Sequence, residues 1–172
     1  SVEFTDGATS LGAAVPVNAG GVATLTTSGL AVGTHPITAS YTGTDEFAES
    51  SDDVSQVVNK RDTSTALTSS ANPSQAGSSV TFTAVVTANG GAVNAGSVTF
   101  AVDGTDQATV AVDANGSASF TTSALSVGSH AIEARYGGTA NENVSDDDLD
   151  QVVSALDSTT VVVSAPNPSV YG

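Results

Sequence analysis

The sequence contains no cysteine, methionine or tryptophan, and only three of its residues are lysine or arginine. Without cysteine, a disulfide framework, a cysteine-based zinc site and a thiol nucleophile are excluded. Eighteen acidic residues give a formal net charge of −15 at pH 7. Such a chain cannot neutralise phosphates, so we expect no nucleic-acid partner and no attraction to anionic membrane surfaces.

Long apolar runs and strong helix formers are also scarce. No stretch resembles a signal peptide or a membrane span, so we expect no membrane insertion in this segment. Aromatic residues make up 5% and hydrophobic residues 39% of the chain, which is enough for cores of modest size. Ser, Thr, Gly, Ala and Val dominate, and this composition favours strands and turns.

A motif of His, Ile, Ala and Tyr at alternate positions occurs twice, 95 residues apart, first within residues 35–41 and then within residues 130–136. The same offset relates several other segments and defines a tandem repeat. It predicts a partial repeat at residues 1–60 that lacks its first two strands, a complete repeat at 61–155, and the first strand of a third repeat at 156–172. We interpret the chain either as an excerpt of a longer array or as a fibre subunit.

Alternating apolar residues predict the strands of each repeat. Val80, Phe82 and Ala84 alternate with threonines, and residues 22–26 alternate with Ala23 and Leu25 on one face. The polar and acidic residues 42–53 are predicted to form a loop. The complete repeat contains about seven short strands separated by turn signals, which is typical of an antiparallel β-sandwich.

An ordered set of segments resembles the bacterial immunoglobulin-like repeat domains of large surface and secreted proteins. The segments that carry the resemblance are Asn72-Pro73-Ser74, Val80–Ala84, Gly96–Phe100, Ala118–Leu125, Gly128-Ser129-His130 and Tyr136. The resemblance implies tandem, all-β Ig-like sandwiches without cysteine, used as spacers or adhesive modules.

The sequence departs from the antibody pattern in lacking the Cys pair and the core Trp. Tyr41 and Tyr136 lie late in their strand, so they do not match the tyrosine corner of antibody domains. The second repeat also lacks the aromatic residue that Phe47 supplies in the first, and we expect Val144 to fill that space.

Three motifs could carry chemistry, and each is better explained by structure. His35 and His130 occupy equivalent positions at the start of the same strand, which is how structural residues recur. The residues 113–116 resemble part of a calcium loop, but the first repeat lacks the acid at this position, so a hairpin turn is favoured. Lys60 lies in a linker rather than in a strand, which argues against an isopeptide bond.

Acidic residues at the repeat boundaries suggest a possible metal site. Asp147 and Asp148 recur in both repeats and are predicted to lie in the loop before the last strand. In an Ig-like sandwich that loop lies at the end where the chain enters, near Asp62. These three carboxylates could bind Ca²⁺ at the repeat junction. The alternatives are a solvated loop, or ion pairing with Lys60 and Arg61.

Together these features predict a non-enzymatic structural segment of an extracellular bacterial protein, either secreted or on the cell surface. It would act as a stalk or spacer, or assemble into a fibre by strand complementation between identical subunits. Its partners would be neighbouring Ig-like repeats or other copies of the chain, and a host or surface glycan would be bound through regions outside this segment. The alternative is an adhesive or carbohydrate-binding accessory module of an adhesin or a secreted hydrolase.

Overall fold

The computed structural model describes residues 1–164 and 170–171, and these residues form two compact units. The first comprises Ser1–Thr63 together with Ala88–Gly91 and Gly137–Val144. The second comprises Ser64–Thr87, Ala92–Tyr136 and the chain from Ser145 onward. The described residues contain strands and turns but no helix, so the all-β prediction is confirmed.

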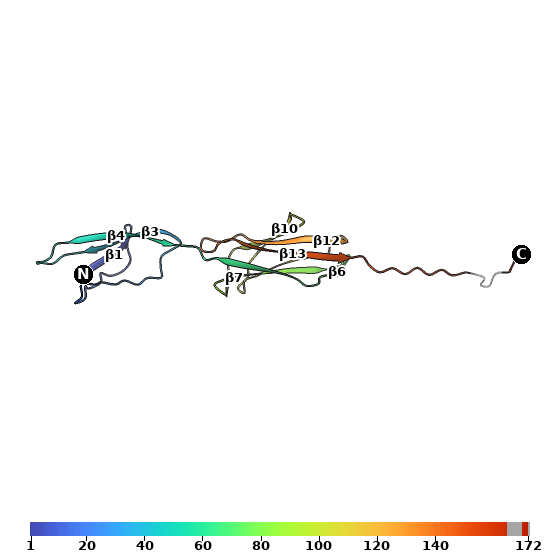
Figure 1. Cartoon of the computed structure of the whole chain (residues 1–172), viewed down its shortest axis with the longest axis horizontal. Helices are drawn as coiled ribbons and strands as arrows, with labels where there is room; N and C mark the ends of the chain where they lie inside the picture. The colour runs from blue at the N-terminus through green and yellow to red at the C-terminus, as the bar shows by residue number, and fades with distance from the viewer. Residues whose placement is uncertain (165–169, 172) are drawn as a thin grey trace. The chain divides into compact units, whose positions relative to one another are not determined.

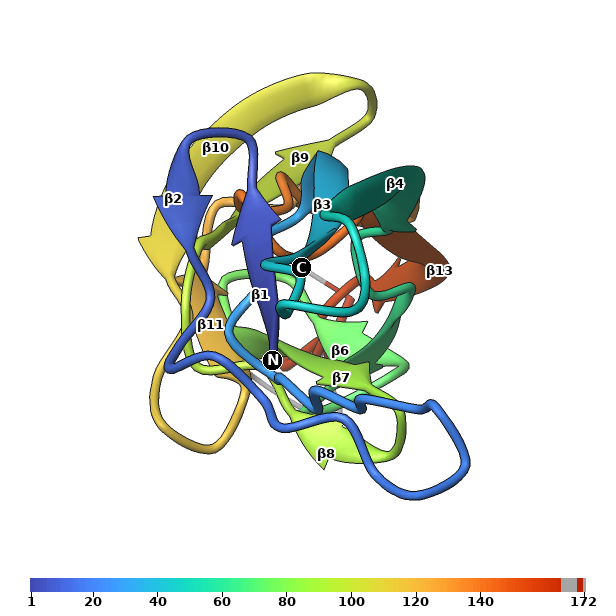
Figure 2. The same cartoon turned by 90° about the vertical axis from the view of Figure 1, so that its left-hand side faces the viewer.

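The first unit contains a single antiparallel sheet in the order β2-β1-β3-β4. Figure 2 labels its strands, which are β1 (Val2–Asp6), β2 (Thr9–Ser10), β3 (Gly33–Tyr41) and β4 (Ser50–Val58). The β1–β3 register pairs Val2 with Tyr41, and the β3–β4 register pairs Tyr41 with Ser50. No side chain of this sheet is fully buried.

The second unit contains two sheets, one in the order β10-β9-β12-β13-β6 and the other in the order β11-β7-β5, with β8 paired to β7. Figure 1 shows several of these strands. Their bounds are β5 (Thr63–Ser69), β6 (Ser74–Gln75), β7 (Val80–Ala88), β8 (Gly91–Ala92), β9 (Ser97–Val102), β10 (Thr105–Ala111), β11 (Ser117–Thr122), β12 (Gly128–Tyr136) and β13 (Ser145–Ser154).

The hydrophobic core lies between the two sheets of the second unit. Alternate residues of β7 are buried, as the period-2 pattern predicts. Phe120 of one sheet stacks against Phe100 of the other, with ring centroids 5.9 Å apart. The Tyr136 ring lies against Gly96, where an added Cβ would come within 2.7 Å of the ring. Gly96 also has a φ of +82°, so both packing and backbone require glycine at this position.

One predicted strand and the end of one predicted loop are wrong in the first repeat. Residues 22–26 do not form a strand, although their counterpart β11 does. The reason is that β11 pairs with β7, and the described first unit contains no equivalent of β7. The predicted loop at residues 42–53 also ends earlier than expected, because β4 begins at Ser50.

By the 95-residue offset, residues 158–164 in the predicted first strand of a third repeat correspond to β5. These residues do not form a strand, and Val161 to Val163 are 82–90% exposed. A strand needs a hydrogen-bonded neighbour, and β5 finds its neighbour in β7. Asn167-Pro168-Ser169 repeats the sequence of Asn72-Pro73-Ser74 at the same 95-residue offset and lies outside the described residues.

Candidate functional site

His130, at the start of β12, lies between a carboxylate and a backbone carbonyl. Its Nδ1 is 2.8 Å from Oδ2 of Asp103, which follows β9, and its Nε2 is 2.9 Å from the carbonyl oxygen of Ser126. Oδ1 of Asp103 also accepts a hydrogen bond of 2.9 Å from the backbone N–H of Ala131. The three residues thereby tie the turn after β9 to the loop before β12.

The first repeat has the same arrangement. His35 Nδ1 is 2.6 Å from Asp6 Oδ2, and its Nε2 is 2.9 Å from the Ala31 carbonyl oxygen. A carbonyl oxygen only accepts hydrogen bonds, so Nε2 must carry a proton, and the carboxylate favours a second proton on Nδ1. The hydrogen bond to Asp6 is the main reason why the pKa of His35 is raised. We name this arrangement the Asp–His clasp.

Ser126 gives the second clasp the residue types of a catalytic triad, since its Oγ lies 3.3 Å from His130 Nε2. A general base must accept the serine proton on this nitrogen. Here Nε2 donates to the Ser126 carbonyl, and the bond to Asp103 raises the pKa of His130, which favours the form that is not a base. The first repeat has Ala31 in place of Ser126. This geometry suits a structural clasp.

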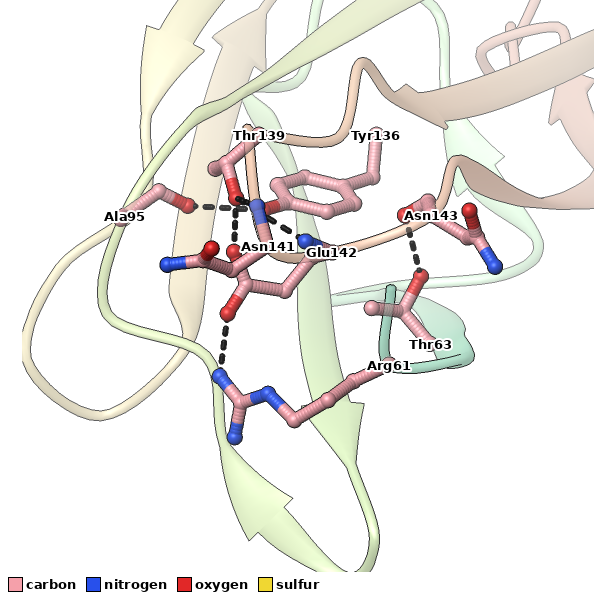
Figure 3. A network of polar contacts seen from close by, with 8 residues as sticks. All are labelled: Arg61, Thr63, Ala95, Tyr136, Thr139, Asn141, Glu142 and Asn143. Carbon is pink, nitrogen blue, oxygen red and sulfur yellow. Dashed lines mark hydrogen bonds and ion pairs between the residues drawn. The ribbon is translucent and has the colours of Figure 1, made fainter. Parts of the chain in front are cut away.

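Figure 3 shows a second polar network, in which the loop Gly137–Val144 holds Arg61 at the start of the second repeat. Glu142 is only 6% exposed, and its carboxylate pairs with the Arg61 guanidinium and accepts the Thr139 hydroxyl. The Arg61 N–H donates to the Asn141 carbonyl at 2.8 Å, and the N–H of Asn143 donates to the Arg61 carbonyl at 2.9 Å. Arg61 is thus bound through both its backbone and its side chain.

The residues that follow Arg61 continue this pattern of contacts at alternate positions. Three groups, two side-chain hydroxyls and one backbone N–H, form hydrogen bonds with the residues just before β13 or within β13. The pairs are Thr63 Oγ1 with the Asn143 carbonyl at 2.9 Å, Thr65 Oγ1 with Ser145 Oγ at 2.7 Å, and Leu67 N with Asp147 Oδ2 at 2.8 Å. We call these contacts, together with those of Arg61, the strand clamp.

The three carboxylates predicted to bind calcium have different surroundings. Asp147 and Asp148 lie within β13 rather than in the predicted loop, so their side chains point to opposite faces of the sheet. Asp147 accepts the Leu67 N–H, Asp148 is exposed, and Asp62 accepts a hydrogen bond of 2.8 Å from the Asn143 amide. No group of three or more acids or histidines with metal-site spacing occurs in residues 1–164 and 170–171. Calcium binding stays a prediction.

Glu142 and Arg61 were not identified as a pair in the sequence, although the repeat contains a signal for them. With the 95-residue offset, Glu142 corresponds to Phe47. An acidic residue at a position where the other repeat has an aromatic ring indicates that the side chain has a different, polar partner. Our expectation that Val144 replaces Phe47 was wrong, because Val144 is 71% exposed and Glu142 occupies the equivalent position.

No curated protein sequence matches the chain. A solved structure of the fibronectin(III)-like modules of Clostridium thermocellum CbhA has a TM-score of 0.47 and 19% identity. The match covers 94% of this chain and 83% of that one. The family model of the bacterial Ig-like domain (group 3) matches residues 1–59 and 67–154. The matched segments make up most of the sequence, and the chain therefore belongs to the bacterial Ig-like domains of group 3.

Proposed function

We propose that this chain is a mechanical spacer in an extracellular bacterial protein, built from Ig-like repeats without catalytic activity. The observation that carries the proposal is the pairing at the ends of the second repeat. Strand β6, near its start, runs parallel to β13, its last strand, with Ser74 opposite Val153 and Gln75 opposite Ser154. Ala76 N–H extends this pairing with a bond of 2.9 Å to the Ser154 carbonyl.

Parallel end strands resist a pulling force better than antiparallel ones. When a repeat is pulled by its two ends, a parallel pair is loaded in shear, so its hydrogen bonds bear the force together. An antiparallel pair would open one bond at a time. The Asn72 side chain adds two further bonds to β13, from its amide to the Asp150 carbonyl at 2.6 Å and from Val152 N–H to its Oδ1 at 3.0 Å.

The composition and the polar network support the same role. A net charge of −15 keeps a repeat array soluble and separated from its neighbours. The histidines, which are the side chains best suited to acid–base catalysis, are held in Asp–His clasps in both repeats. The described residues also contain no helix that could cross a membrane.

A carbohydrate-binding module has less support. Sugar rings bind to platforms of exposed aromatic side chains. The exposed aromatic residues in the described part of the chain are Phe47 and Tyr171. In the second repeat, Phe82, Phe100 and Tyr136 are at most 1% exposed, and Phe120 stacks on both phenylalanines. The rings of this repeat thus form its core.

Single-molecule force spectroscopy tests the proposal. Pulling the chain from its two ends should give one high-force unfolding event for the second repeat, with a length gain set by about 3.3–3.6 Å per released residue. Replacing Ser74 by proline removes a backbone donor on β6 and should lower that force. A repeat that extends without a force peak would overturn the spacer role. Labelling of Ser126 by a fluorophosphonate probe would show that the chain has a reactive serine.

A further inference from the structure

We propose that Asn89, in the turn between β7 and β8 (Figure 2), is a site of spontaneous covalent modification. Its side-chain amide is lost as ammonia, and the backbone at this position becomes an aspartate or isoaspartate linkage. The inference goes beyond the spacer function, and its test does not depend on that function. It rests on a comparison of four turns in which an asparagine or aspartate precedes glycine.

The reaction uses only the chain and water. The backbone nitrogen of the residue after asparagine gives up its proton to water and bonds to Cγ of the asparagine side chain. The Cγ–Nδ2 bond breaks, and this nitrogen leaves as ammonia. Water then opens the cyclic imide at either of its carbonyls, which gives aspartate or isoaspartate. A following glycine favours ring closure because it has no side chain and the greatest backbone freedom.

The sequence and the turn geometry define the four candidates. They are Asp6-Gly7, Asn89-Gly90, Asp103-Gly104 and Asn115-Gly116. Such pairs suit tight hairpin turns, because both residues tolerate the positive φ that a type I′ turn requires. Asn89 and Asp103 both have a φ of 50°, and the glycines that follow them both have a φ of 76°. Any difference in reactivity between these two turns must therefore come from what holds their side chains.

The Asp–His clasp holds the aspartate in two of the four turns. Asp103 Oδ2 lies 2.8 Å from His130 Nδ1, and its Oδ1 accepts the Ala131 N–H at 2.9 Å. The hydrogen bond with His130 is the main reason why the pKa of Asp103 is lowered, so this carboxyl group is ionised. A carboxylate is a poor target for attack by nitrogen. Asp6 is held by His35 at 2.6 Å in the same way.

The turn at Asn115 is held through its backbone. Gly116 N–H donates to the Asp113 carbonyl at 3.0 Å, and Asn115 N–H donates to Asp113 Oδ1 at 2.8 Å. Gly116 is buried, and a Cβ added there would lie 2.5 Å from the Val86 carbonyl oxygen. Ring closure would have to break the Gly116 hydrogen bond and move a buried residue. The fold therefore protects Asn115.

The turn at Asn89 is open. Asn89, Gly90 and Gly91 are all exposed, and a Cβ added at Gly90 would meet no other described atom within 4 Å. Among the described residues, we find no hydrogen bond that holds the Asn89 side chain or the Gly90 N–H. The nitrogen of Gly90 can therefore turn toward Cγ of Asn89 without displacing a buried group.

The two products should affect the second repeat differently. Aspartate keeps a normal backbone and tolerates a positive φ, so this product mainly adds a negative charge. Isoaspartate inserts an additional methylene into the backbone of the turn. Beyond that turn, Val93 N–H donates to the Val86 carbonyl at 3.1 Å, and both side chains are at most 1% exposed. Isoaspartate should therefore lower the stability of this repeat more than aspartate does.

Mass-spectrometric peptide mapping of the 172-residue chain after incubation at mildly alkaline pH tests the proposal. In the folded chain, Asn89 should convert at least about tenfold faster than Asn115, which corresponds to about 1.4 kcal/mol of activation free energy. An isoaspartyl methyltransferase should then label the peptide that contains position 89. In urea the two rates should converge, because both asparagines precede glycine. Equal rates in the folded chain, or no conversion at Asn89, would overturn the proposal and leave the spacer function intact.

Two variants provide matched controls. Asp113→Ala removes the acceptor of the Asn115 and Ser117 N–H groups, and should speed conversion at Asn115 without changing the rate at Asn89. Asp103→Asn places an asparagine in a turn with the same φ angles as the turn at Asn89, but within the Asp–His clasp. Conversion at position 103 should stay slower than at Asn89. Equally fast conversion there would show that the clasp gives no protection and would overturn the comparison.

Discussion

The two repeats have closely related sequences but very different burial. In the second, Ile132, Ala134 and Tyr136 of β12 are at most 1% exposed. Their counterparts on β3, Ile37, Ala39 and Tyr41, are only half-buried. The difference arises because β12 faces a second sheet formed by β11, β7 and β5, and the described first unit has no such sheet.

The comparison also separates interactions that a single sheet can make from those that need a sandwich. The Asp–His clasp forms in both repeats, because all its groups come from the same sheet and its adjoining loop. The buried glutamine forms its network only in the second repeat. Gln151 is fully buried, whereas Gln56 is exposed. Polar contacts within one sheet and its adjoining loop thus form without the second sheet, whereas a buried core does not.

Replacing the equivalent tyrosines of the two repeats by alanine should give the largest difference in lost unfolding free energy. Tyr136→Ala removes a buried ring and the hydrogen bond of 3.0 Å from its hydroxyl to the Ala95 carbonyl, and should cost about 3–5 kcal/mol. Tyr41→Ala removes a half-buried ring and should cost well under half as much. Calorimetry of the full chain would measure both effects. Equal losses would show that the first repeat is packed as tightly as the second.

The glutamines should show the next largest difference. Gln151 Oε1 accepts the Ser69 hydroxyl at 2.6 Å, and its Nε2 donates to the Ala71 carbonyl at 2.9 Å. Gln151→Leu leaves these groups without their partner and should cost about 1–3 kcal/mol of unfolding free energy. Gln56→Leu at the exposed position serves as the control. Urea unfolding would measure the unfolding free energy of both variants. Similar losses for the two would show that Gln56 is also buried and hydrogen-bonded.

Neighbouring aspartates on β13 provide a finer test of the strand clamp. Asp147→Ala leaves the Leu67 N–H without its acceptor and should cost about 1–2 kcal/mol. Asp148→Ala removes the same charge from an exposed position and should change stability by less than about 0.5 kcal/mol. If both variants lost the same amount in urea unfolding, net charge rather than the Leu67 bond would explain the loss.

The Asp–His clasps should make stability depend on pH. The pKa of each histidine is raised from 6.5, mainly by its hydrogen bond to Asp6 or Asp103. Because the folded-state pKa lies above the unfolded-state value, the protonated histidines contribute their full share of the unfolding free energy below pH 6.5. This contribution is lost as the pH rises through the higher pKa of the folded state. The melting temperature should therefore fall as pH rises above 6.5. His35→Gln with His130→Gln should flatten this dependence, and an unchanged slope would contradict the clasp.

Calcium should have the smallest effect. Asp147 and Asp148 lie on opposite faces of β13, and Ca²⁺ needs about six to eight oxygen ligands around one point. We expect the melting temperature to be the same in Ca²⁺ and in EGTA. A rise with Ca²⁺ that Asp62→Ala abolishes would instead establish the predicted calcium site.

Much of the architecture could be predicted from the sequence. The 95-residue period and the alternation in β7 predict repeats of short strands, because side chains on a strand alternate between its faces. The clasp could be predicted only in part. Both histidines were recognised as structural from their recurrence, but their aspartate partners lie 29 and 27 residues away in sequence. The Glu142–Arg61 pair spans 81 residues and was missed.

The sequence by itself determined the repeat, the strand periodicity and the acidic character of this protein, because these are properties of local composition and order. The tertiary structure alone decided which patterned segments become strands. Residues 22–26 and β11 have similar sequences, yet only β11 pairs with a neighbour. A strand is completed by hydrogen bonds to another segment, and the local sequence does not specify whether that segment is present.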